Sequence, residues 1–386
     1  MKKSSDCCIN CFKDQWLKNK IKDSGHRGNC TYCQSRKIKC VTPEKLFDFF
    51  DPIFNLYQSD GYASIMSSFS CGGDEGVFEL LLESDDDADE YDETLAELIQ
   101  EDWNIFDDRL SIAQSNKLLD DIRSLRTYRK ASKAWERHYS ESLNAGDYWS
   151  QFTNYIKKNG IKNINKFYPE TEHFTVFSEF TNISSLHKFI GDNLSKLETK
   201  IEAGSTYFRA RIGDLNIKDM GAPPSDKALV GRANPKGVSY LYLSDSEKTT
   251  IGEVRPWRTA RMTVAEFVIE RALNVIDLSK LPQLYSPFIY ENLYEAISGL
   301  TLIQSLVDDM SKPISPKQSE IDYLSTQYLS DLIKQMDYSG FIFNSSLGNG
   351  KNLVIFDSGC ARPTKIFSKL IVENINYSVR RTKSLF

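Results

Sequence analysis

The sequence contains no long hydrophobic run and no large excess of charge of one sign. No apolar stretch reaches the roughly 18 residues that a membrane-spanning helix needs, and no apolar segment follows the N-terminal lysines. The 48 basic and 53 acidic side chains give a formal net charge of −5, which provides no general attraction to nucleic acid or to an anionic membrane. These absences predict a cytoplasmic protein that does not bind membranes, and they argue against nucleic acid as a partner.

A glycine-rich phosphate-binding loop is also missing, and cysteine is scarce beyond residue 40. No loop of the Rossmann or P-loop kind joins a strand to a helix, so these two nucleotide-binding signatures are excluded. Six of the eight cysteines lie within the first 40 residues, in paired spacing. In a reducing compartment this pattern favours a metal site over disulfides.

The N-terminal segment, residues 1–45, has the spacing of a zinc site. Two Cys-x2-Cys pairs are present: Cys8 with Cys11, and Cys30 with Cys33. Four thiolates can bind one tetrahedral Zn²⁺ ion, which can fold a segment too small to bury its own core. Three further side chains could replace one of the four ligands: Cys7, Cys40 and His26. The residues between the pairs that fit an amphipathic helix are Trp16, Leu17, Lys20 and Ile21. We predict a structural zinc ion.

The next part of the chain, residues 46–190, is predicted to be mostly helical. Its acidic run at 83–93 is interpreted as a solvated loop, because clustered carboxylates repel one another and resist burial. Residues 117–143 are rich in helix formers and in charge pairs three or four apart, which predicts a surface helix. A ribonuclease site on a helix would need arginine and histidine at short spacing on one face, and three side chains do not provide it: Arg129, Arg137 and His138.

From about residue 195 the pattern changes to short segments rich in aromatic and β-branched residues, which predict strands. Six such segments are present: 205–212, 238–243, 263–269, 273–279, 339–346 and 352–357. Between them, residues 326–336 place five side chains on one helical face: Tyr328, Leu329, Leu332, Ile333 and Met336. The predicted fold class is α+β, with a mixed β core and helices in residues 195–380 and a mostly helical domain before it.

Residues 230–256 gather groups that suit a nucleotide. Arg232 lies in a turn before a strand, and Glu253 lies near the end of the helix that follows the strand. Alternation within the strand places three side chains on one face: Val238, Tyr240 and Tyr242. A neighbouring strand presents two arginines on one face: Arg209 and Arg211. Arginine suits phosphate oxygens, aromatic rings offer a stacking surface, and a carboxylate can stabilise a developing positive charge. The alternative is an ordinary salt bridge between Arg232 and Glu253, with the tyrosines as packing residues.

Three motifs in order resemble the RES domain family, whose members are mainly bacterial toxins: "FRAR", "GRANPKGVSYLYLSDSEKTTIGEVRP" and "GFIFNSSLGNGKNLVIFD". The residues that match the family pattern are Arg232, Asn234, Gly237, Tyr242, Glu253, Ser345 and Asn352, with Ser346 as a rival to Ser345. Ala233 departs from the pattern, because small members usually carry an aromatic residue there. The resemblance covers roughly residues 200–360 and implies a fold like that of ADP-ribosyltransferases.

The resemblance implies an enzyme that consumes NAD⁺ as a glycohydrolase, phosphorylase or ADP-ribosyltransferase. Such an enzyme would cleave the nicotinamide–ribose bond and pass ADP-ribose to water, phosphate or a protein. The catalytic residues implied are Glu253 at the ribose, Tyr242 stacked on nicotinamide, Arg232 on the diphosphate and Ser345 as a hydroxyl contact. The residues implied to bind NAD⁺ are Arg209, Arg232, Asn234, Tyr242, Ser345 and Asn352.

The resemblance also bears on the N-terminal part and on partners. Residues 46–190 are similar to the HEPN-like helical region that precedes the RES domain in larger members. The family's toxins are neutralised by a separate antitoxin, and in this chain residues 1–185 could instead hold the enzyme in check. We therefore expect a protein of the toxin or antiphage-defence type, and whether it forms a homo-oligomer stays open. The alternatives are a non-catalytic zinc-bearing module that binds a nucleotide or a partner, and an RNA-acting protein.

Overall fold

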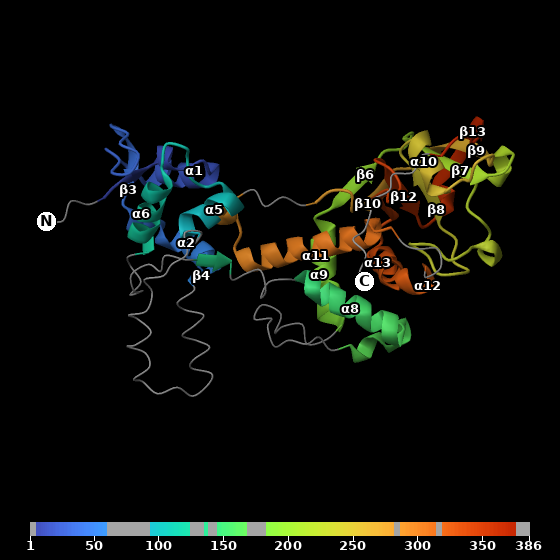
Figure 1. The fold of residues 1–386 in the computed structure, drawn as a ribbon, viewed down its shortest axis with the longest axis horizontal. Helices are drawn as coiled ribbons and strands as arrows, with labels where there is room; N and C mark the ends of the chain where they lie inside the picture. Colours follow the sequence, from blue (N-terminus) through green and yellow to red (C-terminus); the bar gives the residue numbers. More distant parts are fainter. Residues whose placement is uncertain are drawn as a thin grey trace, which may run out of the picture. The chain divides into compact units, whose positions relative to one another are not determined.

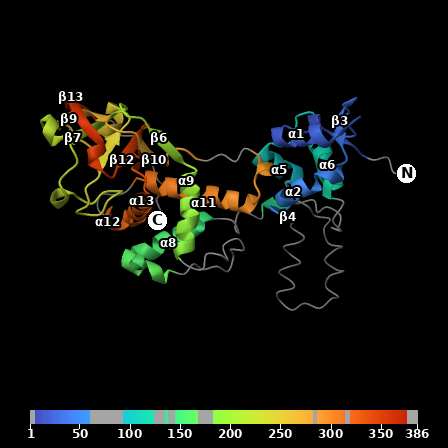
Figure 2. The same cartoon turned by 180° about the vertical axis from the view of Figure 1, so that it is seen from behind.

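The computed structural model describes residues 5–59, 93–123, 135–137, 145–167, 183–281, 286–313 and 319–375. These residues divide into two compact units (Figure 1). The first unit contains the described residues up to 137 together with 286–297. The second unit contains the remaining described residues, and Figure 2 shows both units from behind. None of the helices in the described residues has the length and hydrophobicity that crossing a membrane requires.

The cysteine-bearing segment of the first unit forms a small antiparallel sheet with one helix against it. The strands are β1 (Cys7–Cys8), β2 (His26–Gly28) and β3 (Ile38–Val41), in the order β1-β3-β2. The helix predicted between the cysteine pairs is α1 (Gln15–Ser24). It begins where the Asp14 side chain accepts a hydrogen bond from the Leu17 amide, at 2.7 Å, and it buries Leu17 and Ile21.

Three further helices complete the described core of the first unit: α2 (Phe47–Phe54), α5 (Leu95–Trp103) and α6 (Ile112–Arg123). α5 begins at a capping box, in which the Thr94 side chain and the Glu97 side chain each bond to the other's backbone amide. Two short strands pair antiparallel: β4 (Tyr57–Ser59) and β5 (Trp135–Arg137).

The prediction of a mostly helical segment is confirmed for α2, α5 and α6. It is wrong at 135–137, where β5 replaces the expected surface helix. Of the acidic run 83–93, all but Glu93 lies outside the described residues.

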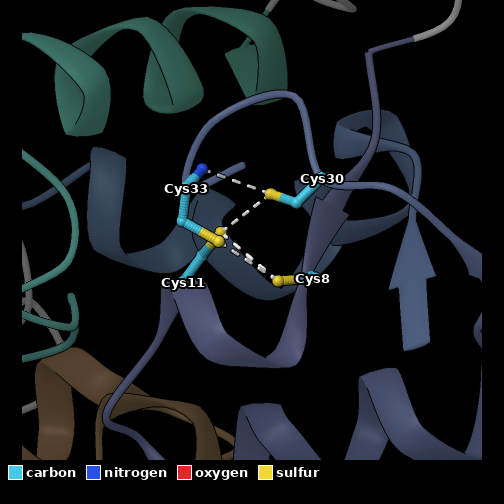
Figure 3. A group of neighbouring side chains, drawn as sticks. All are labelled: Cys8, Cys11, Cys30 and Cys33. Atoms are coloured by element: carbon cyan, nitrogen blue, oxygen red, sulfur yellow. Dashed lines mark hydrogen bonds between the residues drawn. The ribbon is translucent and has the colours of Figure 1, made fainter. Parts of the chain in front are cut away.

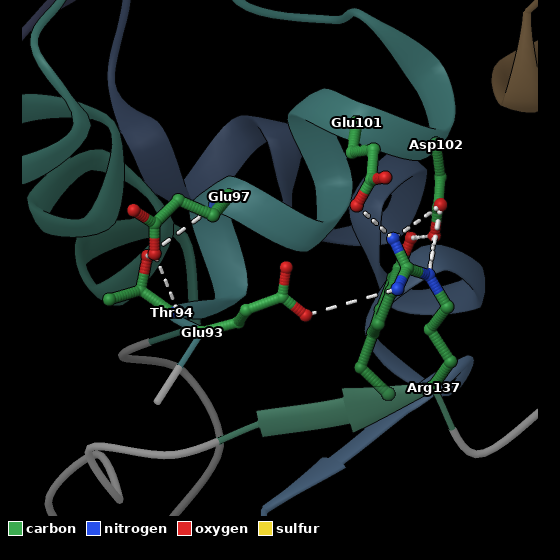
Figure 4. A network of polar contacts seen from close by, with 7 residues as sticks. Glu93, Thr94, Glu97, Glu101, Asp102 and Arg137 are labelled. Atoms are coloured by element: carbon green, nitrogen blue, oxygen red, sulfur yellow. Dashed lines mark hydrogen bonds and ion pairs between the residues drawn. The ribbon is translucent and has the colours of Figure 1, made fainter. Parts of the chain in front are cut away.

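The Arg137 side chain explains why this segment is held as a strand. Its Nε donates to both carboxylate oxygens of Asp102, each at 3.0 Å, and its Nη2 donates to Glu101 at 2.5 Å (Figure 4). Glu93 lies 3.9 Å from Nη1. Arg137 therefore joins β5 to α5 by ion pairs, which is a structural role. The other two residues of the ribonuclease interpretation, Arg129 and His138, lie outside the described residues.

Replacing Arg137 with Met should destabilise the first unit. The Asp102 side chain is only 14% exposed, so loss of the guanidinium leaves a mostly buried carboxylate without its strongest donor. We expect the free energy of unfolding to fall by about 1–3 kcal/mol in chemical denaturation. The control is Arg109→Met, because Arg109 is 57% exposed and its contact with Asp107 spans 3.5 Å. Equal losses in the two variants would contradict the structural role of Arg137.

The second unit is built on one mixed sheet of eight strands, in the order β13-β9-β7-β8-β12-β11-β10-β6. Neighbours are antiparallel except for the parallel pair β10 and β11. Each of the six predicted strand segments overlaps an observed strand: β7 (Thr206–Ile212), β8 (Leu241–Ser244), β9 (Arg261–Ile269), β10 (Leu273–Asp277), β11 (Gly340–Asn344) and β12 (Lys351–Ile355). The two strands at the edges of the sheet were not predicted: β6 (Glu198–Ile201) and β13 (Ala361–Ile371).

The helices of the second unit include the predicted apolar helix, which is α13 (Leu324–Gln335). The others are α8 (Ala145–Asn159), α9 (Ile183–Ser195), α10 (Glu247–Glu253) and α12 (Ser319–Asp322), and α11 (Leu293–Ser311) begins in the first unit and ends in the second. The described 3-10 helices of the two units are η1 (Ile9–Cys11), η2 (Pro43–Leu46), η3 (Ile161–Lys166), η4 (Ile217–Asp219), η5 (Ser225–Lys227), η6 (Pro287–Ile289) and η7 (Ser358–Cys360). The α+β class with a mixed sheet is confirmed.

The division into units differs from the expected boundary between residues 190 and 195. Helices α8 and α9 belong to the sheet-bearing unit, because they pack on α13. The Phe152 ring of α8 lies 4.8 Å from the Tyr328 ring of α13, measured between centroids. The sequence pattern could not show this, since a helix that packs on a sheet domain has the same periodicity as one in a helical domain.

Candidate functional site

The candidate site lies where strands β7 and β8 diverge. They pair only at Phe208 and Ser244, so the rest of this β7 edge needs other partners. The Ala210 amide donates instead to the Thr250 hydroxyl of α10, at 2.9 Å. α10 therefore lies beside β7 (Figure 1), and its last residue is Glu253, as expected from the sequence.

Three of the predicted site residues meet at the Glu253 carboxylate. Its Oε1 accepts hydrogen bonds from the Ser345 hydroxyl at 2.6 Å and from the Asn352 amide at 2.8 Å. Ser345 directly follows β11 and Asn352 lies on the neighbouring strand β12, so the pairing of these two strands brings both donors together. The Ser244 hydroxyl donates to Asn352 Oδ1 at 2.8 Å, which orients the amide. Two bonds to one oxygen hold the carboxylate in a single orientation.

The loop after β11 must pass close to α10 for these contacts to form. A Cβ atom at Gly350 would lie 1.9 Å from the Thr249 hydroxyl and 2.5 Å from Asp245 Oδ1. Thr249 donates to that same Asp245 oxygen at 3.0 Å, so both side chains are already engaged. A glycine at 350 thus allows the loop that carries Ser345 to approach the helix that carries Glu253.

Replacing Gly350 with Ala should move α10 away from the loop. We expect a loss of about 1–3 kcal/mol in unfolding free energy and a clear loss of any activity that depends on Glu253. The matched control is Gly348→Ala in the same loop, because a Cβ atom there would lie 3.9 Å from the Ser345 hydroxyl, an ordinary contact distance. Thermal unfolding of the two variants would test this, and an unchanged Gly350→Ala protein would contradict it.

The Arg232 loop, defined as residues 231–238, is held by the side chain of Asn234. Asn234 is 4% exposed, and its Nδ2 donates to three backbone carbonyls, those of Leu229, Pro235 and Val238, at 2.8–3.1 Å. Its Oδ1 accepts from the Tyr242 hydroxyl at 2.5 Å. A Cβ at Gly231 would lie 2.6 Å from that oxygen, which explains the glycine. The structure thus gives Asn234 a role in shaping the loop, and its contact with NAD⁺ stays a prediction.

The Arg232 guanidinium reaches the end of α11. It donates to the backbone carbonyls of Asp309 at 3.1 Å and Lys312 at 2.8 Å, where the partial negative charge of a helix C-terminus favours a cation. Burial lowers the pKa of Arg232, whereas the charges of Tyr323 and Glu253 act to raise it. Arg232 therefore lies within electrostatic reach of the Glu253 carboxylate, without a direct ion pair between them among the contacts of the described residues. The simple salt bridge considered above is not what joins them.

Arg209 lies on β7, and its side chain bonds to β8, the strand that carries Tyr242. Its Nη1 donates to the Tyr242 carbonyl at 2.9 Å, and its buried Nε has no hydrogen-bond partner in the described part of the structure. Burial lowers the pKa of Arg209 to about 10, and the neighbouring Arg211 acts in the same direction. A buried N–H without an acceptor is costly, so an anionic ligand oxygen would be favourable there. Arg211 instead donates to the Asp219 carbonyl at 2.6 Å.

The two tyrosines of the predicted aromatic face have different surroundings. β8 begins at Leu241, so Val238 and Tyr240 precede the strand and the prediction of one shared strand face is wrong. The Asn234 bond to the Val238 carbonyl holds that residue in the loop. Tyr240 packs on Phe356, with ring centroids 4.9 Å apart. The Tyr242 hydroxyl is bound by the loop, and burial raises its pKa. Stacking of the Tyr242 ring on nicotinamide stays a prediction.

Two residues that hold the Arg232 loop were not singled out by the sequence: Thr326 and Gln327. Thr326 and Gln327 lie on α13, and their side chains donate to backbone carbonyls of the Arg232 loop. Both are buried. In the sequence these two residues are only polar positions beside the apolar face of a helix. Such positions are common on helices and do not show which segment they bond to.

The second candidate site is the cysteine cluster of the first unit. The sulfur atoms of Cys8, Cys11, Cys30 and Cys33 all lie within 4.8 Å of one another (Figure 3). Three of the sulfur pairs are separated by 3.3, 3.5 and 3.9 Å. A tetrahedral zinc–sulfur site with bonds of about 2.3 Å has sulfurs about 3.8 Å apart, so this donor set fits Zn²⁺. Hydrogen bonds from Cys11 and Cys8 lower the pKa of Cys30, while the pKa values of Cys8 and Cys11 are raised in turn, so the cluster favours one thiolate, at Cys30.

The three alternative zinc ligands lie outside this cluster. His26 contacts Asp6 through Nε2 at 2.9 Å, and the Cys7 thiol donates to the Val41 carbonyl at 3.5 Å. Cys40 is buried and pairs with Cys8 across the sheet. The four cysteines predicted from spacing are thus the ones that converge, and they could hold a metal ion.

Fold and site define an α+β domain in which arginines, a carboxylate and hydroxyl groups gather beside two diverging strands. Residues 206–374 match the model of the RES domain family, so the chain carries a RES domain. This range contains every residue of the candidate site near Glu253. The RES family is known for NAD-acting toxins, so the match supports an NAD-related enzyme family of the toxin type for this domain.

The chain is also similar to a solved structure. The crystal structure of the M. tuberculosis MbcT–MbcA toxin–antitoxin complex contains a chain with 13% sequence identity to this one. The similarity covers 48% of this chain and 93% of that one, with a TM-score of 0.31. No curated protein is significantly similar. The family match therefore carries the assignment.

Proposed function

We propose that the chain is an enzyme that cleaves the bond between nicotinamide and ribose in NAD⁺. The single observation that carries this proposal is the Glu253 carboxylate, oriented by Ser345 and Asn352 inside a domain of an NAD-acting family. Cleavage leaves a positive charge on the ribose while neutral nicotinamide departs. The site therefore needs a fixed negative charge beside the sugar more than it needs a general acid.

In this proposal the two arginines bind the diphosphate. Arg232 uses two N–H groups on the end of α11, and a guanidinium has further donors for phosphate oxygens. Arg209 contributes a buried N–H that lacks a protein acceptor among the described residues. Both arginines are linked to Tyr242, one through its carbonyl and the other through the loop that its hydroxyl holds. Tyr242 would thus set the spacing between phosphates and sugar.

Ser345 would act mainly on Glu253. Its hydroxyl donates to the carboxylate and accepts from the Leu347 amide at 3.1 Å, so its hydrogen is already directed at Oε1. We propose that Ser345 and Asn352 hold Oε1 and thereby turn the other carboxylate oxygen toward the ribose. The acceptor of ADP-ribose is water, phosphate or a protein side chain, and each would attack the same face of the sugar.

The test is incubation of the purified full-length chain with NAD⁺, followed by measurement of free nicotinamide. Including phosphate in one arm and a host protein extract in another, with analysis of the ADP-ribose product, distinguishes the three acceptors. Binding of NAD⁺ without release of nicotinamide would favour the non-catalytic module. Inhibition by a separate antitoxin or by residues 1–185 stays a prediction. Because α8 and α9 belong to the sheet-bearing unit, self-inhibition would be tested by the same assay on a chain expressed without residues 1–137.

A further inference from the structure

The Arg232 loop takes its shape from helix α13, which lies outside the three family motifs. The loop has no regular secondary structure, so its backbone carbonyls need donors from elsewhere. Three of these carbonyls accept hydrogen bonds from α13. Gln327 Nε2 donates to the carbonyls of Gly231 at 2.9 Å and Asn234 at 3.0 Å, and the Thr326 hydroxyl donates to the Arg232 carbonyl at 2.7 Å.

These two donors are held rigidly. Gln327 is 7% exposed and Thr326 is 1% exposed. The helix that carries them buries three apolar side chains: Leu329, Leu332 and Ile333. The loop closes on itself by only a few backbone bonds, among them Gly231 N to the Asn234 carbonyl at 2.9 Å. Gln327 therefore donates to the same Asn234 carbonyl that accepts the Gly231 amide. Its side chain bonds to both ends of the turn, at Gly231 and at Asn234.

We propose that Gln327, assisted by Thr326, is a positioning residue that holds the Arg232 loop in the conformation that binds the diphosphate of NAD⁺. The expected effect on NAD⁺ binding rests on the proposed function, whereas the contacts between Gln327 and the loop do not. Gln327 acts only through the loop. Because Arg232 would bind a part of the substrate that does not react, loss of its position should raise KM more than it lowers kcat.

The first experiment does not depend on activity. Gln327→Met keeps the length of the side chain and removes both donors, which should speed hydrogen exchange of the backbone amides in residues 228–238 of the full chain. Gln335→Met is the matched control, since Gln335 lies on the same helix and donates to Asp331 on an exposed surface at 2.7 Å. Unchanged exchange in Gln327→Met would overturn the inference. If Gln327→Met does not fold, Thr326→Val removes a single donor to the same loop and serves in its place.

The second experiment is a double-mutant cycle with Arg232→Ala. We expect Gln327→Met to lower kcat/KM for NAD⁺ by about tenfold, mostly through KM, and to cause no further loss when Arg232 is already Ala. Independent losses in the two backgrounds would show that Gln327 does not act through Arg232. A wild-type chain that leaves NAD⁺ intact would contradict the proposed function, and hydrogen exchange would still decide whether Gln327 holds the loop.

Discussion

Glu253→Gln is expected to slow release of nicotinamide from NAD⁺ by about a hundredfold or more. The substitution removes the negative charge that would stabilise the ribosyl cation, an interaction typically worth about 3–4 kcal/mol. It keeps a carbonyl oxygen that can still accept from Ser345 and Asn352, so the fold around the site should persist. The loss should therefore appear in kcat rather than in thermal stability. Initial rates of nicotinamide release at several NAD⁺ concentrations would measure it.

The matched control for this prediction is Glu270→Gln. Glu270 lies in the same domain and pairs with Arg362 at 2.6 Å on the surface, where both side chains are largely exposed. Removing a surface charge of this kind changes stability and activity little. A Glu253→Gln protein that releases nicotinamide at the wild-type rate would remove Glu253 from the proposed mechanism. A similar loss in Glu270→Gln would show that the effect is not specific to the site.

Removal of the metal is expected to unfold the first unit. In zinc-finger peptides, metal binding supplies an apparent free energy of about 10–16 kcal/mol at neutral pH, and small segments of this kind are unfolded without it. The four sulfurs here join β1 and η1 to the loop after β2, so the ion would cross-link segments that also share a small sheet and the apolar core of the first unit. Treatment with a strong chelator should expose Trp16, which stacks on Phe288 with centroids 5.8 Å apart, and shift its fluorescence.

The corresponding variant is Cys11→Ser, with Cys40→Ser as its control. Both cysteines are fully buried, and Cys11 belongs to the four-sulfur cluster while Cys40 does not. We expect elemental analysis to find one zinc ion per chain in the wild type and in Cys40→Ser, and much less in Cys11→Ser. Equal zinc loss in both variants would show that the ligand set is different. A wild-type chain that contains no metal and stays folded would contradict the zinc site.

Much of the fold could be predicted from periodicity, because side chains in a strand alternate between a core and an outer face. Strands β9 to β12 and the apolar face of α13 are clear in the sequence for this reason. The edge strand β13 was missed because most of its side chains are exposed or partly exposed, which removes the apolar signal. β5 was missed because it pairs with β4 and is tied to α5 by Arg137, and both contacts join segments far apart in the chain.

The sequence by itself determined which chemical groups this protein has available. Motif order placed Arg232, Tyr242, Glu253 and Ser345 in one domain, and residue spacing identified the two cysteine pairs. Spacing could do so because ligands three apart in a tight turn can reach one ion whatever the rest of the chain does.

Only the tertiary structure decided how these groups are used. It directed Ser345 and Asn352 onto one oxygen of Glu253, turned Asn234 into the loop and brought Gln327 from α13 to the Arg232 loop. Outside the Arg232 loop, the two residues of such a contact lie far apart in the chain. Glu253 and Asn352, for example, are separated by 99 positions. No local pattern encodes such contacts, because each depends on the packing of strands and helices that meet only in the folded domain.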